Sequence, residues 1–509
     1  MIRPFFCSIS SAVFLILSFP LFDFSFLIWI ALVPLFIVVE NHRPWPAFGW
    51  GYLTGGFFFS GTLYWFIHVT LPGVILLVLY LALYFGLFAG LAARFARSPA
   101  RRLWFYPSLW VGLEYIRGHF LTGFGWISLA HTQYRLPLLM QMADVTGTAG
   151  LTFFIVMVNV WFKEVWLYLG KRPHTRARTI LWPTGFFVIL IFAVIVIYGQ
   201  IRLSEKIFPS SVKIAAIQPN VPLDDRLSTE LWSDILDHQL ELSRQASAQA
   251  PDLIIWPETA FPGYSWEEGE LLDRMKSFTL VTHRPLLFGI VTKEEEHYFN
   301  AAMLLAEGEE QLQHHKLHLV PFGEYIPFRD KLKFLENIVP IDDFTAGSNY
   351  TLFPVRGSQL GGQSVVLAVL ICFEDTIPEL SREFVRQGAN ILVNITNDAW
   401  FQKTAAPFQH LQASIFRAVE NRRSLVRVAN TGVSAFIDPY GRITRRVADA
   451  RKQQIDVSGF AVEPVWANST TTFYTKYGDI FTIFCFGCIL WGIITGFCRK
   501  NQAHPSIRL

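Results

Sequence analysis

The sequence predicts a multi-spanning α-helical membrane domain of about eight helices joined to one α/β domain. Of the 509 residues, 52% are hydrophobic and only 16% are charged, whereas a soluble protein averages about 25% charged residues. Between about 212 and 462 short β-type runs alternate with helical stretches, which indicates an α/β domain. The formal net charge of +3 is close to neutral for this length and argues against nucleic acid as the main partner.

Eight apolar segments are candidates for membrane spans, because a spanning helix needs about 20 mostly apolar residues. The first, second and fifth are shorter or weaker than the rest. A signal peptide over 1–22 is disfavoured, because no small-residue cleavage site follows and a second apolar run begins almost at once. The segments are 6–22, 24–40, 46–68, 71–94, 103–117, 147–170, 179–200 and 475–498.

The basic residues predict the orientation of these segments, since arginine and lysine collect in cytoplasmic loops. They cluster at Arg43, 94–102, 171–178 and 499–508, all on one side if every segment spans. Both termini are then cytoplasmic. The long region between the seventh and eighth segments lies on the other side, which in a bacterium is the periplasm. We therefore expect a transmembrane domain at 1–200, a periplasmic domain at 201–472, and a last span with a cytoplasmic tail at 473–509.

Charged residues within the apolar segments are functional candidates by default. Glu114, Arg117 and Asp144 lie at the expected outer side, and we expect an interfacial structural pair or a headgroup contact there. Lys163 and Glu164 lie inside the sixth segment and are expected to reach the interface or to pair.

The five cysteines predict no metal site. Cys485 and Cys488 have a redox or metal spacing, but no second ligand pair lies nearby and a zinc site needs four ligands. Cys7 and Cys498 also lie in apolar segments. Cys372 is the only cysteine between 201 and 472, so we expect it to remain a free thiol in an oxidising compartment.

The region from 212 to 462 contains strand-like runs, several of them apolar throughout, as in strands covered on both faces. Two helices are expected, at 230–249, where the polar Gln239 interrupts the apolar stripe, and at 410–424. The strand-like runs are 212–221, 253–259, 285–292, 301–307, 365–375, 390–400 and 424–438.

Three residues at strand ends or in loops supply a base, a cation and a nucleophile. Glu258 follows the run LIIWP, Lys316 lies in HHKLHLVPFGEYIP, and Cys372 follows VVLAVLI. Each residue taken alone has a simpler explanation: Glu258 as a solvated turn residue, Lys316 as a surface lysine and Cys372 as a core cysteine. Together they fit nucleophilic catalysis, because a thiol with a pKa of about 8.5 needs a neighbouring base or cation. His410 and the other nearby histidines have no carboxylate at a position that predicts a Cys–His triad.

The order Glu–Lys–Cys, carried by WPE, by a lysine before VPFGEYIP and by ICFED, resembles the nitrilase superfamily. Joined to a multi-spanning region, the chain resembles throughout its length the bacterial apolipoprotein N-acyltransferase family. Further matching stretches are 123–134, 141–153, 217–221, 397–401, 409–411, 417–423 and 429–441.

This resemblance implies an αββα sandwich for the α/β domain, with Glu258 as general base, Lys316 as oxyanion stabiliser and Cys372 as nucleophile. Glu324 matches a second family glutamate that positions or assists the lysine, and Glu374 matches a carboxylate two residues after the nucleophile.

The chain departs from the family pattern at two positions. Phe373 stands where a tyrosine is common, so a hydroxyl role there is absent. Gln402 stands where a glycine is usual, so the adjoining loop is expected to differ in shape.

The resemblance also implies a reaction without cofactor or metal. An acyl chain passes from a membrane phospholipid, by family analogy from the sn-1 ester of phosphatidylethanolamine, through a Cys372 thioester to the N-terminal amine of a diacylglyceryl-cysteine apolipoprotein. This is the last step of lipoprotein maturation. Loops at 261–266 and 400–408, with Trp266, Trp400 and Phe401, are candidates for the substrate entrance.

Two alternatives stay open. A membrane-anchored nitrilase or amidase would use the same three residues but resolve the thioester with water. A lipid-binding scaffold or transporter would use the α/β domain for binding only and would tolerate loss of the Cys372 thiol.

Overall fold

The computed structural model describes residues 2–96, 98–170, 175–205, 211–263, 269–327, 343–357 and 364–502, with the backbone alone at 175–180, 227 and 498–502. Two compact units divide the chain. One consists of Met1–Ser204 and Tyr477–Leu509, and the other is Glu205–Lys476. The basic residues Arg97, Lys171 and Arg172 and the tail beyond 502 lie outside the described residues.

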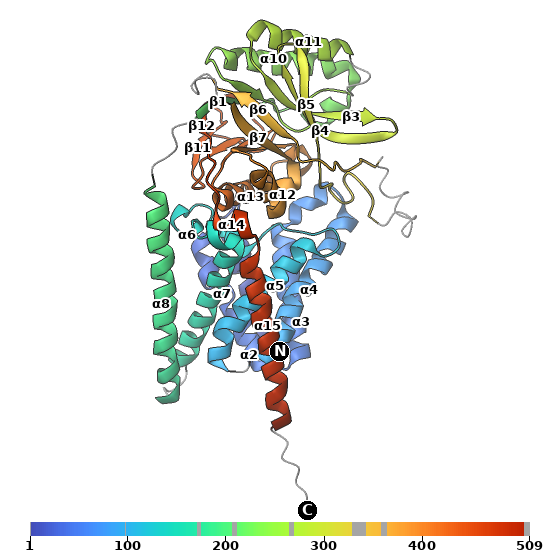
Figure 1. Cartoon of the computed structure of the whole chain (residues 1–509). Coiled ribbons are helices and arrows are strands. Elements are labelled where there is room, and N and C mark those ends of the chain that lie inside the picture. Colours follow the sequence, from blue (N-terminus) through green and yellow to red (C-terminus); the bar gives the residue numbers. More distant parts are fainter. Residues whose placement is uncertain are drawn as a thin grey trace, which may run out of the picture. The chain divides into compact units, whose positions relative to one another are not determined.

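The first unit is helical, and each of the eight predicted apolar segments contains a helix. Among the described residues, four helical stretches are long and apolar enough to cross a membrane: Leu71–Phe95, Ala143–Gly170, Leu181–Leu203 and Ile480–Phe497. The prediction of eight spans is therefore supported for these four only. The elements are α1 Ile2–Ser18, η1 Ser25–Trp29, α2 Val33–Asn41, α3 Pro44–Thr62, η2 Tyr64–His68, α4 Leu71–Phe95, α5 Pro99–His119, η3 Leu129–Gln133, α6 Pro137–Met140, α7 Ala143–Gly170, α8 Thr175–Leu203 and α15 Ile480–Gln502 (Figure 1).

Small residues let α3 and α4 approach closely. A Cβ on Gly51 would lie 2.4 Å from the Phe85 carbonyl oxygen, and one on Gly55 would lie 2.9 Å from the Phe85 Cβ. Such close backbone approach is a common way to pack membrane helices, because lipid gives helices no hydrophobic reason to associate.

Several charged residues of this unit form ion pairs with one another. Lys163 lies 2.6 Å from both Glu40 and Glu164, and Arg102 lies 2.9 Å from Glu40. Asp144 lies 2.9 Å from Arg202. Lys163 and Glu164 therefore pair with each other, one of the two arrangements that we expected.

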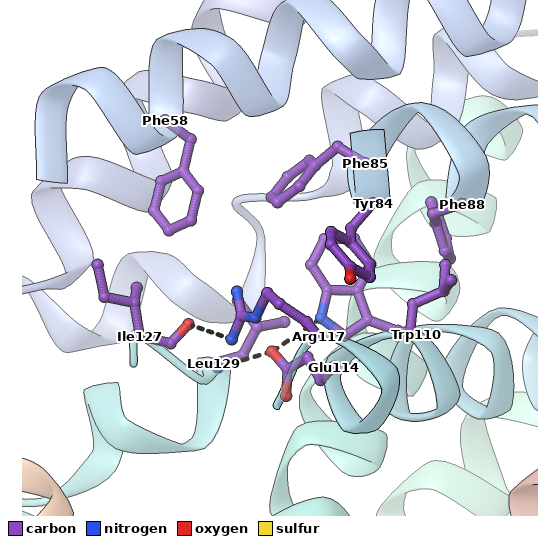
Figure 2. Close-up of a pocket in the computed structure, with 10 residues that line it drawn as sticks. Phe58, Tyr84, Phe85, Phe88, Trp110, Glu114, Arg117, Ile127 and Leu129 are labelled. Atoms are coloured by element: carbon purple, nitrogen blue, oxygen red, sulfur yellow. Dashed lines mark hydrogen bonds between the residues drawn. The ribbon is translucent and has the colours of Figure 1, made fainter. Parts of the chain in front are cut away.

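Glu114 and Arg117 hold the segment after α5. Glu114 accepts hydrogen bonds from Ser128 Oγ at 2.8 Å and Leu129 N at 3.1 Å, while Arg117 donates to the Ile127 carbonyl at 3.2 Å. Figure 2 shows both beside a cavity lined mainly by aromatic and aliphatic side chains of α3, α4 and α5. The polar atoms of Glu114 and Arg117 are therefore used mainly in hydrogen bonds that stabilise this part of the fold.

The second unit contains two six-stranded sheets with the orders β12-β1-β2-β3-β4-β5 and β11-β10-β9-β8-β7-β6. The pairs β1–β2, β2–β3, β7–β8 and β8–β9 are parallel. The strands are β1 Ser211–Gln218, β2 Leu253–Ile255, β3 Leu286–Glu294, β4 His297–Ala306, β5 Glu309–His315, β6 Leu352–Arg356, β7 Ser364–Ile371, β8 Ile391–Thr396, β9 Ser424–Ala429, β10 Ala435–Ile437, β11 Ile443–Arg446 and β12 Gly459–Trp466.

The two sheets pack face to face, and helices cover their outer faces (Figure 1). Helices α10 and α11 lie on the first sheet, and α12 and α13 on the second. This arrangement confirms the predicted α/β sandwich. The helical elements are α9 Leu223–Leu227, η4 Thr229–Leu231, α10 Trp232–Ser247, α11 Gly269–Thr282, η7 Cys372–Thr376, α12 Pro378–Arg386, η8 Asp398–Phe401, α13 Ala406–Asn421 and α14 Phe473–Tyr477.

Strand β1 shows why the central strands are apolar throughout. Ile214 and Ala216 belong to the core between the sheets, whereas Ala215 and Ile217 belong to the core beneath α10 and α11. Because successive side chains of a strand point to opposite faces, a strand covered on both faces needs apolar residues at every position.

Gln239 does not break the buried face of α10. It is 2% exposed, and its Nε2 donates to the Ala260 carbonyl at 3.0 Å. The side chain that interrupts the apolar stripe thus ties α10 to the loop that follows Glu258.

Candidate active site

Glu258 lies just beyond the end of β2, where the chain leaves the first sheet. Trp256 anchors this exit, because its buried indole donates to Ser243 Oγ at 2.8 Å. A Cβ on Gly289 of the neighbouring strand β3 would lie 2.2 Å from Thr259 N and 2.6 Å from Glu258 Cα. Only glycine permits this approach, so Gly289 defines the position of the Glu258 backbone.

Lys316 follows β5 and is 1% exposed. Its Nζ lies 2.8 Å from Glu324 Oε1 and 3.6 Å from Glu258 Oε1. Burial opposes the charge of the ammonium, but the carboxylates of Glu324 and Glu258 outweigh it and raise the pKa of Lys316 above its ordinary value. The structure thus places a permanent cation between two glutamates.

Asn300, on β4, bridges the same two glutamates. Its Nδ2 donates to Glu258 Oε1 at 2.8 Å and to Glu324 Oε1 at 2.9 Å. The remaining oxygens accept from backbone: Glu258 Oε2 from Asn397 N at 2.9 Å and Glu324 Oε2 from Val320 N at 2.7 Å. Both side chains therefore accept at both oxygens, as carboxylates do.

Cys372 is the first residue of η7 and directly follows β7, with a left-handed φ of 56°, a conformation that costs a residue other than glycine about 1–3 kcal/mol. Its Sγ accepts a hydrogen bond from Thr396 Oγ1 at 3.5 Å. Burial and the charge of Glu258 raise the pKa of the Cys372 thiol well above its ordinary value, while Lys316 and Thr396 act in the opposite direction. The resting group is a thiol that needs a base.

Glu374 joins the lysine segment to the cysteine turn. It accepts from Leu317 N at 2.6 Å, from His318 N at 3.0 Å and from Ile371 N at 2.7 Å. Burial raises the pKa of Glu374 to about 7, against these N–H groups and the charge of Lys316, which lower it. One carboxyl group thus accepts hydrogen bonds from backbone N–H groups next to both Lys316 and Cys372.

The structure describes two of the three predicted entrance residues. Trp400 in η8 is 53% exposed, and Phe401 is half-buried beside it. Trp266 lies outside the described residues. Gln402 adopts φ 52° and ψ −160°, so it takes a backbone conformation that favours the glycine usual at this position.

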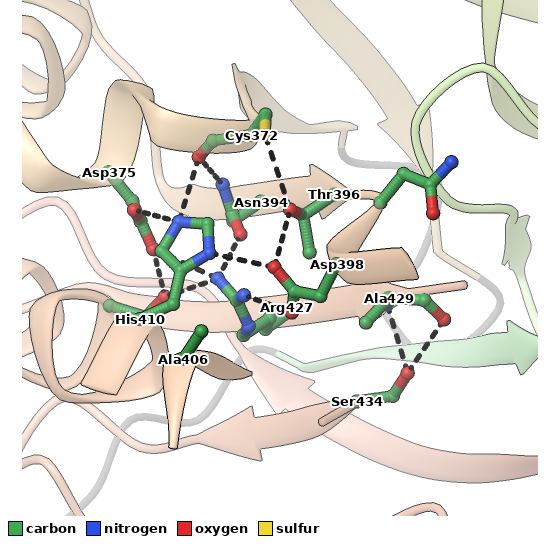
Figure 3. A network of polar contacts seen from close by, with 12 residues as sticks. Cys372, Asp375, Asn394, Thr396, Asp398, Ala406, His410, Arg427, Ala429 and Ser434 are labelled. Atoms are coloured by element: carbon green, nitrogen blue, oxygen red, sulfur yellow. Dashed lines mark hydrogen bonds and ion pairs between the residues drawn. The ribbon is translucent and has the colours of Figure 1, made fainter. Parts of the chain in front are cut away.

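A buried polar network beneath Cys372 was not predicted (Figure 3). No carboxylate partner of His410 could be predicted from the sequence, but the structure places its ring nitrogens 2.9 Å from Asp375 Oδ1 and 3.1 Å from Asp398 Oδ1. His410 approaches the backbone oxygen of Cys372 at 3.3 Å. These residues stand in stretches that resemble the family, but separations along the chain do not reveal such a cluster. Within the described ranges, no group of three or more His, Cys, Asp or Glu is arranged to hold a metal ion.

Two family models match the chain. Residues 11–161 match the family described as Apolipoprotein N-acyltransferase N-terminal domain, and residues 213–458 match the family described as Carbon-nitrogen hydrolase. An amidase mutant of the nitrilase superfamily from Nesterenkonia AN1 is 18% identical, with a TM-score of 0.39, over 54% of this chain and 98% of its own.

Relatives are similar along the whole chain. The apolipoprotein N-acyltransferase of Geobacter metallireducens is 36% identical over 99% of this chain and 97% of its own length. That of Thermotoga maritima is 29% identical over 94% of this chain and 90% of its own. The chain therefore belongs to the apolipoprotein N-acyltransferase family and is an acyltransferase.

Proposed function

We propose that this protein moves a fatty acyl chain from a membrane phospholipid to the N-terminal amine of a diacylglyceryl-cysteine apolipoprotein, with Cys372, Glu258 and Lys316 as its catalytic residues. The observation that carries the proposal is the position of Lys316 Nζ, 3.6 Å from Glu258 Oε1, with both charges acting on the Cys372 thiol. Glu258 Oε2 accepts from Asn397 N at 2.9 Å and Cys372 Sγ accepts from Thr396 Oγ1 at 3.5 Å, so the two groups contact consecutive residues. Acyl transfer through a thioester requires a nucleophile, a proton acceptor and a cation close to one another.

In the first half-reaction Glu258 takes the thiol proton and Cys372 Sγ attacks an ester carbonyl of the phospholipid. Lys316 Nζ and the backbone N–H of Phe373 stabilise the oxyanion of the tetrahedral intermediate. The ester C–O bond then breaks, and the lysophospholipid alkoxide takes the proton from Glu258. A thioester on Cys372 remains.

In the second half-reaction the neutral amine of the acceptor attacks the thioester carbonyl. Glu258 accepts a proton from the amine, the C–S bond breaks, and the proton passes to the departing sulfur. The products are an amide and the starting thiol, so no cofactor or external reductant is needed. Glu324 and Asn300 hold Lys316 and Glu258 in place throughout.

The helical unit supports a membrane setting for this chemistry. We place the protein in the bacterial inner membrane, with segments at 1–200 and 473–509 spanning it and the domain at 201–472 on the periplasmic side. Both substrates carry acyl chains, and each CH₂ taken out of a lipid environment costs about 0.8 kcal/mol. An enzyme held in the membrane meets such substrates by lateral diffusion.

Exposed aromatic residues near the site are suited to lipid entry. Trp400 and Phe322 are 53% and 46% exposed, on loops next to Asn397 and Glu324, which contact the proposed catalytic groups. We assign the segment around Trp400 and Phe401 to the substrate entrance.

A transfer assay tests the proposal and separates it from hydrolysis. The full chain is incubated in vesicles with a phospholipid that carries a labelled acyl group, with and without a diacylated lipopeptide. We expect labelled amide only when the acceptor is present, and none with Cys372→Ser. Labelled free fatty acid at the same rate with or without acceptor would indicate a hydrolase, and no labelled product from the wild type would indicate a scaffold. Labelled amide that persists in Cys372→Ser would contradict the role of Cys372 as nucleophile.

A further inference from the structure

The carbonyl oxygen of Cys372 is held by two buried side chains. Asn394 Nδ2 donates to it at 2.9 Å, and His410 Nε2 lies 3.3 Å away. The hydrogen bond to the sulfur comes from Thr396 instead. Both act on the backbone of the nucleophile, at the residue with the left-handed φ of 56°.

His410 is a hydrogen-bond donor at both ring nitrogens. Nε2 lies 2.9 Å from Asp375 Oδ1 and Nδ1 lies 3.1 Å from Asp398 Oδ1, and a carboxylate only accepts. Burial and Arg427 lower the pKa of His410, but Asp375 and Asp398 outweigh them and raise it above its ordinary value. The ring is a buried imidazolium whose Nε2–H is shared between Asp375 and the Cys372 oxygen.

The surrounding charges are balanced and fully buried. Arg427 donates to Asp375 and Asp398, at 3.1 Å in each case, so two cations face two carboxylates. Arg427 also donates to Asn394 Oδ1 at 2.6 Å, which orients the Asn394 amide toward the Cys372 oxygen. Figure 3 shows this network extending from β8, β9 and α13 to the cysteine turn. A balanced network of this kind is rigid, because moving one member leaves a buried charge unpaired.

Peptide geometry connects the network to the reacting atoms. The peptide bond between Cys372 and Phe373 is planar, and in a trans peptide the C=O and N–H groups point in opposite directions. Two donors that fix the Cys372 carbonyl therefore also fix the direction of the Phe373 N–H, away from the network. A cationic donor on the carbonyl polarises the peptide as well, which makes the N–H a stronger donor.

We propose that His410, together with Asn394, is a positioning residue for acyl transfer: it orients the Cys372–Phe373 peptide so that its N–H meets the oxygen of the developing oxyanion. This inference rests on the proposed function, because it requires an acyl group on Cys372. His410 contacts the backbone oxygen of Cys372 and acts through this peptide group. Its effect is on the height of the barrier and not on lipid binding.

The test uses the full chain in vesicles with phospholipid labelled with ¹³C at the ester carbonyl, without acceptor, so that the thioester accumulates. The variants are His410→Leu and His410→Gln, which keeps one donor. The control is Asn421→Ala, because Asn421 is a buried polar residue of the same helix, donates to Ser381 Oγ at 3.2 Å, and does not contact Cys372.

We expect His410→Leu to lower the rate of thioester formation by about 100-fold, the cost of a misplacement of about 1 Å at the reacting centre, with the KM for phospholipid unchanged. The infrared band of the ¹³C thioester carbonyl should move to higher wavenumber, because its hydrogen bond is weaker. His410→Gln should fall between the wild type and His410→Leu. Asn421→Ala should change melting temperature but not the band.

The inference is overturned if the band stays in place in both His410 variants, or if their rates fall only with the folded fraction, as expected for Asn421→Ala. Where His410→Leu does not fold, His410→Gln gives the same two readings. A wild-type protein that forms no thioester would instead overturn the proposed function, and this inference with it.

Discussion

Substituting Glu324 by glutamine tests the division of labour between the two glutamates around Lys316. The ammonium lies 2.8 Å from Glu324 Oε1 and 3.6 Å from Glu258 Oε1. At an effective dielectric constant of about 20, these separations correspond to attractions of about 6 and about 5 kcal/mol. Glu324 therefore holds the lysine more tightly than Glu258 does, and Glu258 is left able to accept a proton.

In Glu324→Gln the lysine has one carboxylate left and should move toward Glu258. Shortening the distance between Lys316 Nζ and Glu258 to that of a direct ion pair adds roughly 1 kcal/mol of attraction. This makes Glu258 a weaker proton acceptor by about five- to tenfold. We expect thioester formation to slow by at least that factor. Loss of a charge-assisted hydrogen bond should also lower the free energy of unfolding by about 1.5–3 kcal/mol.

The assay is single-turnover acylation of the full chain, followed by intact-protein mass, with thermal unfolding measured on the same preparations. Glu307→Gln, in the exposed turn between β4 and β5, is the matched control and should behave as the wild type. An acylation rate for Glu324→Gln equal to that of the wild type would refute the idea that Glu324 keeps Lys316 away from Glu258.

Three further predictions follow from local geometry. Gly289→Ala should displace Glu258 and lower kcat by about 100-fold, whereas Gly269→Ala, whose methyl meets nothing within 4 Å, should not; equal activities would contradict the close approach. Gln402→Gly should raise the free energy of unfolding by about 1 kcal/mol in chemical denaturation by relieving φ 52°, and a lower value would contradict strain there. Since the folded-state pKa of Glu374 is raised from 4.5 to about 7, the folded protein binds the extra proton in this range, and stability falls as pH rises through it. In Glu374→Gln this pH-dependent part of the stability should be absent from melting temperatures recorded between pH 4.5 and 7. A pH dependence equal to that of the wild type would contradict the raised pKa of Glu374.

The fold was largely predictable, because its signals are local. Apolar runs of strand length and helical stripes identified strands such as β1, β7 and β8 and helices such as α10 and α13. The outer strand β5, Glu309–His315, was missed, because its EEQLQHH sequence is mostly exposed and has no apolar pattern. The burial of Gln239 could not be predicted for a related reason: a pattern does not show that a polar group has a carbonyl partner.

The candidate site was predictable only as a set of residue types. Glu258, Lys316 and Cys372 were chosen for their chemistry and their resemblance to a family, and their separations along the chain contain no information about distance. Asn300 and His410 could not be assigned, since each depends in part on partners more than 20 residues away in sequence. The strained φ of Cys372 likewise has no signature in the run ICFED.

The most direct test of the account is the intact mass of the full chain after incubation with phospholipid of a single acyl composition. The account predicts an added mass of one acyl group, located on Cys372, absent in Cys372→Ala, and removed when a diacylated lipopeptide is supplied. An acyl adduct that persists in Cys372→Ala would contradict it.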